Sequence, residues 1–297
     1  MTYKITHRTV YDYDHDVSLS HHLVRLTPRA LERQHCLEQS IETLPEASTR
    51  SDHTDHFGNT ATYLTIEGAH RRLEIISRSL VQASPAVVPP LPGEMPRWET
   101  LRDLCSADAL EAPIEPVELV FPSPLIPQRA DFYGYAKPSF PDGRPVLEAA
   151  QELSARLHED FAFDASATTV MTTVPEFFKV RRGVCQDFAH LMIACLRSLG
   201  LPARYVSGYL ETAPPPGQPR LTGADASHAW VSLWCGDAGW IELDPTNNLL
   251  PSGRHLTVAW GRDFGDVSPV HGVLVGSGSH QLSVSVDVIP NGLAGVP

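Results

Sequence analysis

The chain has 297 residues, with 23 lysines and arginines against 35 aspartates and glutamates, so its formal net charge is -12 at pH 7 with neutral histidine. An acidic chain without a block of basic residues binds nucleic acid and anionic membranes poorly, so we expect neither as a partner. Hydrophobic residues make up 42% of the chain and charged residues 20%, a balance that excludes intrinsic disorder and is ordinary for a globular protein.

No stretch of the sequence stays apolar over the roughly 20 residues that a membrane-spanning helix needs. The opening MTYKITHRTVYDYDHD also lacks the apolar core of a signal peptide. We therefore expect a cytoplasmic protein. The length suits one large domain or two ordinary ones.

Residues 1–84 carry the pattern of β structure. Tyr3, Ile5, Thr9 and Tyr11 fall on alternating positions, and Asp, Asn and Gly turn residues separate the segments, as at 57–59. This alternation is typical of strands with one buried face. We expect an antiparallel sheet or small sandwich that forms an N-terminal β domain over 1–84.

Segment 85–130 is dense in proline. Proline fixes φ and withholds a backbone donor, so this segment is predicted as a linker with one short helix around 99–110. The domain boundary is placed here. Residues 131–297 would then form the second domain.

Three helices are predicted at the start of the second domain. The first follows Pro145, the second covers Val174 to Val180, and the third follows Gly183 and ends at Gly200. The third has the spacing of a buried helix. Its apolar positions are Phe188, Leu191, Met192, Cys195, Leu196 and Leu199.

Strand-like segments follow these helices, and helices followed by an antiparallel sheet predict an α+β domain. The proline-rich loop over 212–226 should lie on the surface and border a site. The predicted strands are Ala203 to Leu210, His228 to Cys235, Trp240 to Leu243, Leu256 to Trp260, Val270 to Val275 and Leu282 to Val288.

Cys185 stands where a glycine-containing turn becomes the buried helix. A helix N-terminus presents unpaired N–H groups and about half a positive charge, which favours a thiolate over a thiol. The thiolate is the form that attacks carbonyl groups, and the same N–H groups can hold the oxyanion of a tetrahedral intermediate. This position therefore predicts a nucleophile.

His228 and Asp244 complete a candidate constellation. His228 begins one predicted strand and Asp244 ends the next, with a hairpin through 236–239 between them. A thiol nucleophile needs a base, and the base needs an acceptor that fixes its tautomer. The order Cys, His, Asp meets both needs.

The hairpin register decides whether these two side chains meet. With a three-residue loop over 236–238, Cys235 faces Gly239 and Trp230 faces Asp244. His228 then becomes the diagonal neighbour of Asp244. A loop of even length would turn Asp244 to the opposite face.

Several segments around Cys185, His228 and Asp244 together resemble the bacterial transglutaminase-like superfamily. Four ordered motifs at sensible spacing form a specific signal. They are GVCQDFAHL at 183–191, LPARYVSGY at 201–209, SHAW at 227–230 and GWIELDPT at 239–246. Segments 13–29 and 55–59 resemble the family's bacterial N-terminal β domain, and GRDFGDV at 261–267 resembles its C-terminal signature.

The resemblance implies a papain-like catalytic core with Cys185 as nucleophile, His228 as general base and acid, and Asp244 as the orienting residue. The reaction would be attack on an amide carbonyl, loss of amine or ammonia, and a thioester that water or a second amine resolves. The substrate would be a protein or peptide, with Trp230 and Gln186 as candidate contacts. Hydrolysis and glutamine–amine crosslinking remain open.

One departure from the family favours hydrolysis slightly. Transglutaminases proper use an aromatic side chain upstream of the cysteine as a second oxyanion donor, and 138–184 contains no Trp or Tyr. Gln186, Tyr133 and Tyr135 are the polar substitutes. A rival of another class is a non-catalytic binding module that keeps the fold and has lost the chemistry.

Each candidate also has a structural alternative. Cys185 could be a buried thiol, His228 a core histidine, and Asp244 a turn residue before a proline. Trp230 could wall the cleft or belong to the core. Asp187 should complement the helix dipole.

Neighbouring polar residues favour structural roles more strongly. His190 falls well round the helix from Cys185. Arg262, Asp263 and Asp266 could line a substrate path, but an ion pair is favoured.

Metal and disulfide chemistry have weak support. The closest groups among the 14 histidines are His21-His22 and His53-x-x-His56, and neither has a cysteine pair or an H-E-x-x-H beside it. We expect no metal and no cofactor. The five cysteines are odd in number and scattered, which favours reduced thiols; they are Cys36, Cys105, Cys185, Cys195 and Cys235.

Overall fold

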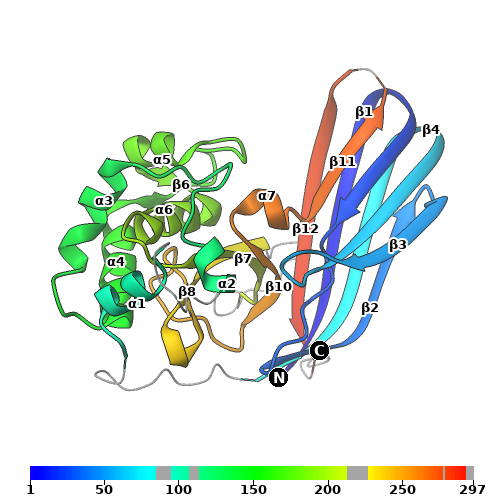
Figure 1. Ribbon diagram of the computed structural model, residues 1–297. Coiled ribbons are helices and arrows are strands. Elements are labelled where there is room, and N and C mark those ends of the chain that lie inside the picture. The colour runs from blue at the N-terminus through cyan, green and yellow to red at the C-terminus, as the bar shows by residue number, and fades with distance from the viewer. Residues whose placement is uncertain (85–94, 107–113, 213–226, 277, 292–297) are drawn as a thin grey trace, which may run out of the picture.

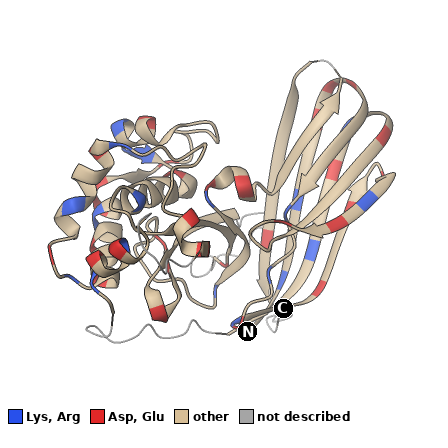
Figure 2. Ribbon diagram, in the orientation of Figure 1, with Lys and Arg blue, Asp and Glu red and all other residues tan. Residues whose placement is uncertain are grey.

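The computed structural model describes residues 1–84, 95–106, 114–212, 227–276 and 278–291. A tall antiparallel sheet lies beside a body in which helices cover a smaller sheet (Figure 1). This arrangement confirms the predicted α+β class. Acidic and basic residues are interspersed along the ribbon of both parts (Figure 2). None of the described helices has the length and apolar character needed to span a bilayer.

The tall sheet has six strands, and its two long central strands pair with each other antiparallel. Tyr3, Ile5 and Thr9 are buried along the first of them, as their alternation predicts. The strands are β1 (Thr2–Val24), β2 (Gln34–Leu44), β3 (Thr49–Thr54), β4 (Thr60–Ala83), β11 (Val270–Val275) and β12 (His280–Pro290).

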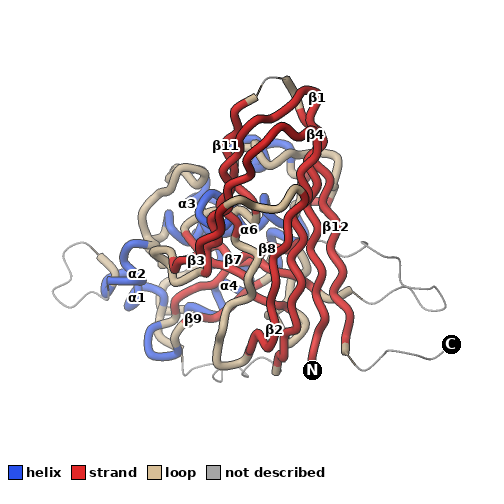
Figure 3. The backbone as a smooth tube through the Cα atoms, turned by 90° about the vertical axis from the view of Figure 1, so that its right-hand side faces the viewer, coloured by secondary structure: helices blue, strands red, loops and turns tan. Residues whose placement is uncertain are grey.

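The membership of β11 and β12 corrects the predicted grouping of 131–297 as one domain. β12 pairs with Tyr3–Tyr13 of β1 and β11 pairs with Leu19–Val24, so both join the N-terminal sheet (Figure 3). The alternation of these segments identified them as strands but could not name their partner. β4 pairs with only one side of β1, so the backbone N–H and C=O groups on the other side need partners. β11 and β12 supply these partners.

Two parts of this sheet belong to different apolar clusters: the part around the start of β1 and the end of β12, and the part around the middle of β1 and β4. Val286 and Val288, with the start of β1, join the same apolar cluster as the helices of the body. Val17, Leu64 and Leu73 belong to a second cluster formed within the sheet itself. The part around the start of β1 and the end of β12 is therefore continuous with the apolar core of the body.

The segment predicted as a linker contains more helix than expected. The helix predicted around 99–110 is α1 (Trp98–Leu104), and 107–110 lies outside the described residues. A further helix, α2 (Ile114–Glu118), follows within the segment, and α3 (Ala130–Ala136) begins at its end. Trp98 and Leu101 are buried, so this segment adds to the core.

The three helices predicted for the second domain are confirmed, and the helix after Gly183 is buried over most of its length. A short 3-10 turn, η1 (Lys137–Ser139), and two short strands, β5 (Ala162–Phe163) and β6 (Arg182–Gly183), accompany them. The helices are α4 (Val146–Asp160), α5 (Val174–Val180) and α6 (Cys185–Ser198).

The smaller sheet has four antiparallel strands in the order β10-β7-β8-β9. Its predicted strands are confirmed within one residue at each end, and a four-residue helix, α7 (Phe264–Val267), follows the last. Of the predicted loop over 212–226, residues 213–226 lie outside the described residues. The strands are β7 (Ala203–Leu210), β8 (Ser227–Trp234), β9 (Trp240–Leu243) and β10 (His255–Gly261).

The β8–β9 hairpin has the odd register that a meeting of His228 and Asp244 requires. A 3-10 turn, η2 (Gly236–Ala238), joins the strands, and the Cys235 N–H donates to the Gly239 carbonyl at 2.8 Å. Val231 lies opposite Leu243. This register puts the ends of the two strands on one face, where His228 and Asp244 lie.

The N-terminal sheet closes the outer edge of β10 with side-chain amides. Gln34 is fully buried, accepts the Thr257 N–H at 2.8 Å and donates to the Thr257 carbonyl at 2.7 Å. Asn59 makes the same pair of bonds with Trp260, at 3.0 and 2.8 Å. An open sheet edge leaves backbone N–H and C=O groups unpaired. The side-chain amides of Gln34 and Asn59 therefore take the place of a neighbouring strand along β10.

Candidate active site

Cys185 is the first residue of α6 and is partly buried. The turn before it requires glycine, because a Cβ at Gly183 would collide with the Asp187 carboxylate and would lie 2.9 Å from the Phe177 ring. Asp187 accepts the Val184 N–H at 2.8 Å, which closes the first turn of the helix. The thiol is thus held at the helix N-terminus by a tight local turn.

Asp187 takes part in this turn rather than in the polar group around His228. It is buried, and its second donor is the Thr168 hydroxyl at 2.7 Å. Burial raises the pKa of Asp187, although both hydrogen bonds oppose this. Its position in the first turn agrees with the predicted match to the helix dipole.

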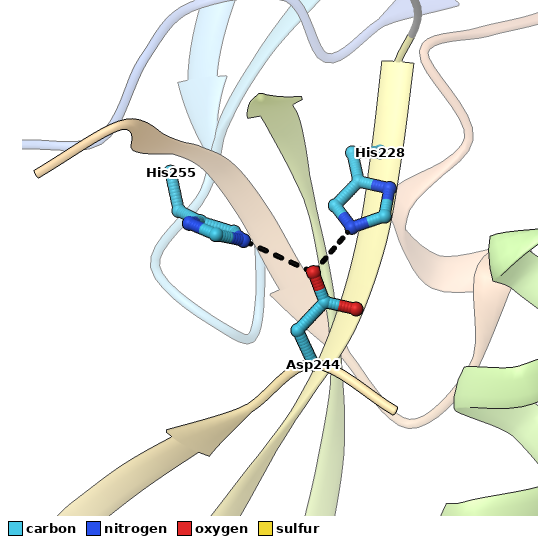
Figure 4. A group of neighbouring side chains, drawn as sticks. All are labelled: His228, Asp244 and His255. Carbon is cyan, nitrogen blue, oxygen red and sulfur yellow. Dashed lines mark hydrogen bonds and ion pairs between the residues drawn. The ribbon is translucent and has the colours of Figure 1, made fainter. Parts of the chain in front are cut away.

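His228 and Asp244 meet on neighbouring strands, as the register requires. The Nε2 of His228 lies 2.7 Å from the Oδ2 of Asp244 (Figure 4). Cys185 interacts with the same imidazole, and this interaction raises the pKa of His228. The structure therefore brings the three predicted residues together in the order thiol, imidazole, carboxylate.

The charge state of His228 follows from these partners. Burial alone would lower its pKa, but the hydrogen bond with Asp244 and the interaction with Cys185 outweigh burial and raise the pKa to about 10. Burial would likewise raise the pKa of Asp244, yet its hydrogen bonds, above all with His228, hold it well below its usual range. The pair is an imidazolium bonded to a carboxylate.

The Asp244 carboxylate is fully buried and fully engaged. Its Oδ1 accepts the backbone N–H groups of Thr246 and Asn247 at 3.1 and 3.2 Å. Its Oδ2 accepts the Asn247 amide at 2.8 Å besides the bond with His228. The turn bonds of the predicted structural alternative are therefore present, and the same carboxylate also bonds His228; its orienting role stays a prediction.

His255 is a fourth member of this group that the sequence patterns did not single out. It opens β10, is 1% exposed, and places its Nε2 at 3.1 Å from the same Oδ2 of Asp244 (Figure 4). No motif or periodicity marks it. The available signal is its place immediately before the predicted strand Leu256 to Trp260, which becomes β10 and pairs with β7.

His228, Asp244 and His255 are the one group among the described residues whose atoms could ligate a metal, since these atoms lie within 4.8 Å of one another. The Ser252 N–H donates to Nδ1 of His255 at 3.3 Å, so the ring proton sits on Nε2. A metal at Nε2 would move that proton to Nδ1, where it would face the Ser252 N–H. The donor set therefore fits a hydrogen-bond network better than a metal site.

Trp230 and Gln186, the predicted substrate contacts, are both buried. The Trp230 ring is 0% exposed and lies 6.0 Å from the His228 ring and 5.3 Å from the His255 ring, measured between centroids. The Gln186 amide donates to the Val170 carbonyl at 3.3 Å. Their contact with substrate stays a prediction, while Trp230 supports the two imidazoles.

The tyrosines considered as oxyanion donors stand differently. The Tyr135 hydroxyl donates to Asp160 at 2.8 Å, and Tyr133 is exposed on α3. A third tyrosine, Tyr205, is buried on β7 and interacts electrostatically with Cys185, which together with burial raises its pKa. The sequence patterns did not single out Tyr205.

The remaining polar candidates have structural roles. Arg262 and Asp266 form the expected ion pair, with contacts at 2.9 and 3.0 Å. Asp263 caps α7 by accepting the Gly265 N–H at 2.8 Å. His190 accepts the Phe264 N–H at 3.1 Å, and burial lowers the pKa of this imidazole to about 4. These contacts join α6 to the loop after β10.

Comparison with protein families identifies both parts of the chain. Residues 3–82 match the model of the bacterial transglutaminase-like N-terminal region. Residues 136–245, which include Cys185, His228 and Asp244, match the model of the transglutaminase-like superfamily. The chain belongs to the transglutaminase-like superfamily.

Relatives of this superfamily member match either most of the chain or one part of it. An uncharacterised protein of Mycobacterium tuberculosis (strain H37Rv) is 40% identical over 97% of this chain and 92% of its own. A protein-glutamine gamma-glutamyltransferase of Pseudomonas aeruginosa is 37% identical over 36% of this chain and 17% of its own. A crystal structure from Cytophaga hutchinsonii, described as a proposed cysteine protease, has a TM-score of 0.75 and 21% identity over 99% of this chain and 92% of its own. That similarity shows the fold.

Proposed function

We propose that this superfamily member is a cysteine-dependent acyl-transfer enzyme that acts on amide bonds of a protein or peptide. The observation that carries the proposal is that His228 interacts with Cys185 and hydrogen-bonds with Asp244 at 2.7 Å. A nucleophile, a base within reach and an acceptor that orients the base are the parts that nucleophilic catalysis requires.

The reaction follows from these atoms. The Cys185 sulfur attacks the amide carbonyl carbon, and the backbone N–H groups in the first turn of α6 face the developing oxyanion, since a helix leaves these donors without intrahelical partners. The C–N bond then breaks as His228 passes its proton to the departing amine. A thioester to Cys185 remains.

The second half regenerates the enzyme. His228 takes a proton from water or from a second amine, which attacks the thioester carbonyl. The sulfur leaves as thiolate, and the product is a carboxylic acid or a new amide. Asp244 stays ionised throughout and stabilises the imidazolium that forms twice in the cycle.

Between the two outcomes we propose hydrolysis. The segment upstream of Cys185 over 138–184 contains no Trp or Tyr, and the Tyr135 hydroxyl is bonded to Asp160. The aromatic oxyanion donor of crosslinking enzymes thus has no counterpart in that segment. The relatives include both chemistries by name, a gamma-glutamyltransferase and a proposed cysteine protease.

Thiol reactivity tests the proposal without knowledge of the substrate. Burial raises the pKa of the other four thiols, to about 11 for Cys105 and about 12 for Cys235. We expect iodoacetamide to label Cys185 much faster than these four at pH 7, and His228→Ala to remove the difference. Equal labelling of all accessible thiols would support a non-catalytic binding module instead.

A second experiment separates hydrolysis from transfer. The enzyme is incubated with a glutamine peptide and a labelled primary amine at millimolar concentration. Release of ammonia without amine incorporation is the expected result. Incorporation in excess of hydrolysis would identify a crosslinking enzyme, and Cys185→Ala should abolish either reaction.

A further inference from the structure

His255 lies within the polar group described above, yet it touches neither the thiol nor the position of the reacting carbonyl. It comes from β10, whereas His228 comes from β8 and Asp244 follows β9, so three strands converge on one carboxylate (Figure 4). Its ring is almost fully buried. A buried histidine needs partners for both nitrogens, and the structure supplies them.

The two partners fix which nitrogen carries the proton. Nδ1 accepts the Ser252 N–H at 3.3 Å, so Nε2 bears the hydrogen and donates to Oδ2 of Asp244 at 3.1 Å. A donor of fixed direction therefore reaches the carboxylate from the side of β10. The backbone N–H of His255 also donates to the Ser252 carbonyl at 2.9 Å, so the backbone of His255 is held against the turn at Ser252.

The ring orientation of His255 is fixed by packing as well. The Trp230 ring meets His255 edge to face, with an interplanar angle of 84° and a centroid separation of 5.3 Å. The same indole lies 6.0 Å from His228 at 30°. One buried aromatic side chain thus holds the planes of both imidazoles.

We infer that His255 is a positioning residue that fixes the Asp244 carboxylate in the orientation in which Oδ2 meets Nε2 of His228. The inference rests on the proposed function, since it concerns the base of that reaction. Oδ1 is held only by two backbone N–H groups of one turn. The bond from His255, with that from the Asn247 amide to the same Oδ2, opposes rotation of the carboxylate about its Cβ–Cγ bond, so the His228 ring keeps its orientation.

A pair of substitutions separates positioning from packing. Glutamine at this place retains an N–H donor near the position of Nε2, whereas methionine has similar length and no donor. We expect His255→Met to slow iodoacetamide alkylation of Cys185 by about tenfold to a hundredfold, the range for a lost hydrogen bond to a charged group. His255→Gln should restore the rate to within about threefold of wild type.

The matched control is another buried histidine with two side-chain partners. His7 bonds the Tyr209 hydroxyl at 3.0 Å and the Thr9 hydroxyl at 3.1 Å. His7→Gln should lower the melting temperature and leave the alkylation rate of Cys185 unchanged. The melting temperatures of all three variants are measured as well, and they show whether a change in alkylation rate accompanies a loss of stability.

The outcomes separate this inference from the proposed function. If His228→Ala slows alkylation and His255→Met does not, His255 has no positioning role while the function stands. Equal slowing in His255→Met and His255→Gln would reduce His255 to a packing residue. If Cys185 in the wild type reacts no faster than in His228→Ala, both proposals fall.

A measurement on the wild-type protein covers the case in which the methionine variant does not fold. Imidazole nitrogen shifts from NMR report the tautomer directly. We expect His255 to be protonated on Nε2 and to show a proton signal there that shifts in Asp244→Asn. A ring protonated on Nδ1 alone would overturn the inference.

Discussion

Cys185 and His228 reach the same site from two regions that are held together by different forces. Cys185 begins a helix whose residues from Gln186 to Arg197 are buried, so apolar packing places the thiol. His228 stands at the end of a strand, and its partner Asp244 accepts five hydrogen bonds. Packing tolerates small adjustments of shape, whereas a hydrogen-bond network depends on single atoms.

The largest expected effect comes from breaking the network at its centre. Asp244→Asn keeps the shape and removes the charge that stabilises the imidazolium and fixes its tautomer. We expect kcat for amide hydrolysis to fall on the order of 10³- to 10⁴-fold. Asp237→Asn, in the exposed turn of the same hairpin, is the control and should act like wild type. An Asp244→Asn variant of nearly normal kcat would refute the orienting role.

The next effect tests whether the N-terminal sheet supports the body through β10. Gln34→Ala leaves the buried N–H of Thr257 without a partner, whereas the Thr257 carbonyl keeps the Arg29 N–H at 3.2 Å. One unpaired buried group costs about 1–3 kcal/mol, so we expect a loss of that size in the free energy of unfolding. Urea denaturation measures it, with the exposed Gln281→Ala as control. Equal stability of the two variants would contradict the edge-closing role.

The packing side of the comparison is tested at the turn before Cys185. Gly183→Ala places a methyl group against the Asp187 carboxylate and the Phe177 ring. We expect a loss of about 1–3 kcal/mol, typical of overpacking. Gly134→Ala in α3 has open space around its Cβ and should be neutral or slightly stabilising. A neutral Gly183→Ala would mean that the turn can relax.

The last prediction concerns how the free energy of unfolding changes with pH through His228, which we expect to be a small change for each pH unit. His228 has a pKa near 6.5 when unfolded and about 10 in the fold, so its contribution to stability is complete below pH 6.5 and is lost as pH rises through 10. The slope from this one proton is at most about 1.4 kcal/mol per pH unit. His228→Ala should flatten the curve of unfolding free energy between pH 7 and 10. An unchanged slope would assign the loss to other groups.

How far prediction from sequence reaches depends on the range of the signal. The buried stripe from Phe188 to Leu199 and the tight turn at Gly183 lie within a few residues, and both are confirmed in α6. The β8–β9 register also follows from a local count of loop residues. Local periodicity and turn length are properties of neighbouring residues, so they can be deduced before any fold is known.

The sequence by itself determined where Cys185, His228 and Asp244 lie along the chain and which secondary structure carries each. Only the tertiary structure decided that His255 shares the carboxylate, that Trp230 is buried beside two imidazoles, and that β11 and β12 complete the first sheet. The physical reason is that each of these features depends on which strands become neighbours. Alternation of apolar residues marks a strand but carries no information about its partner.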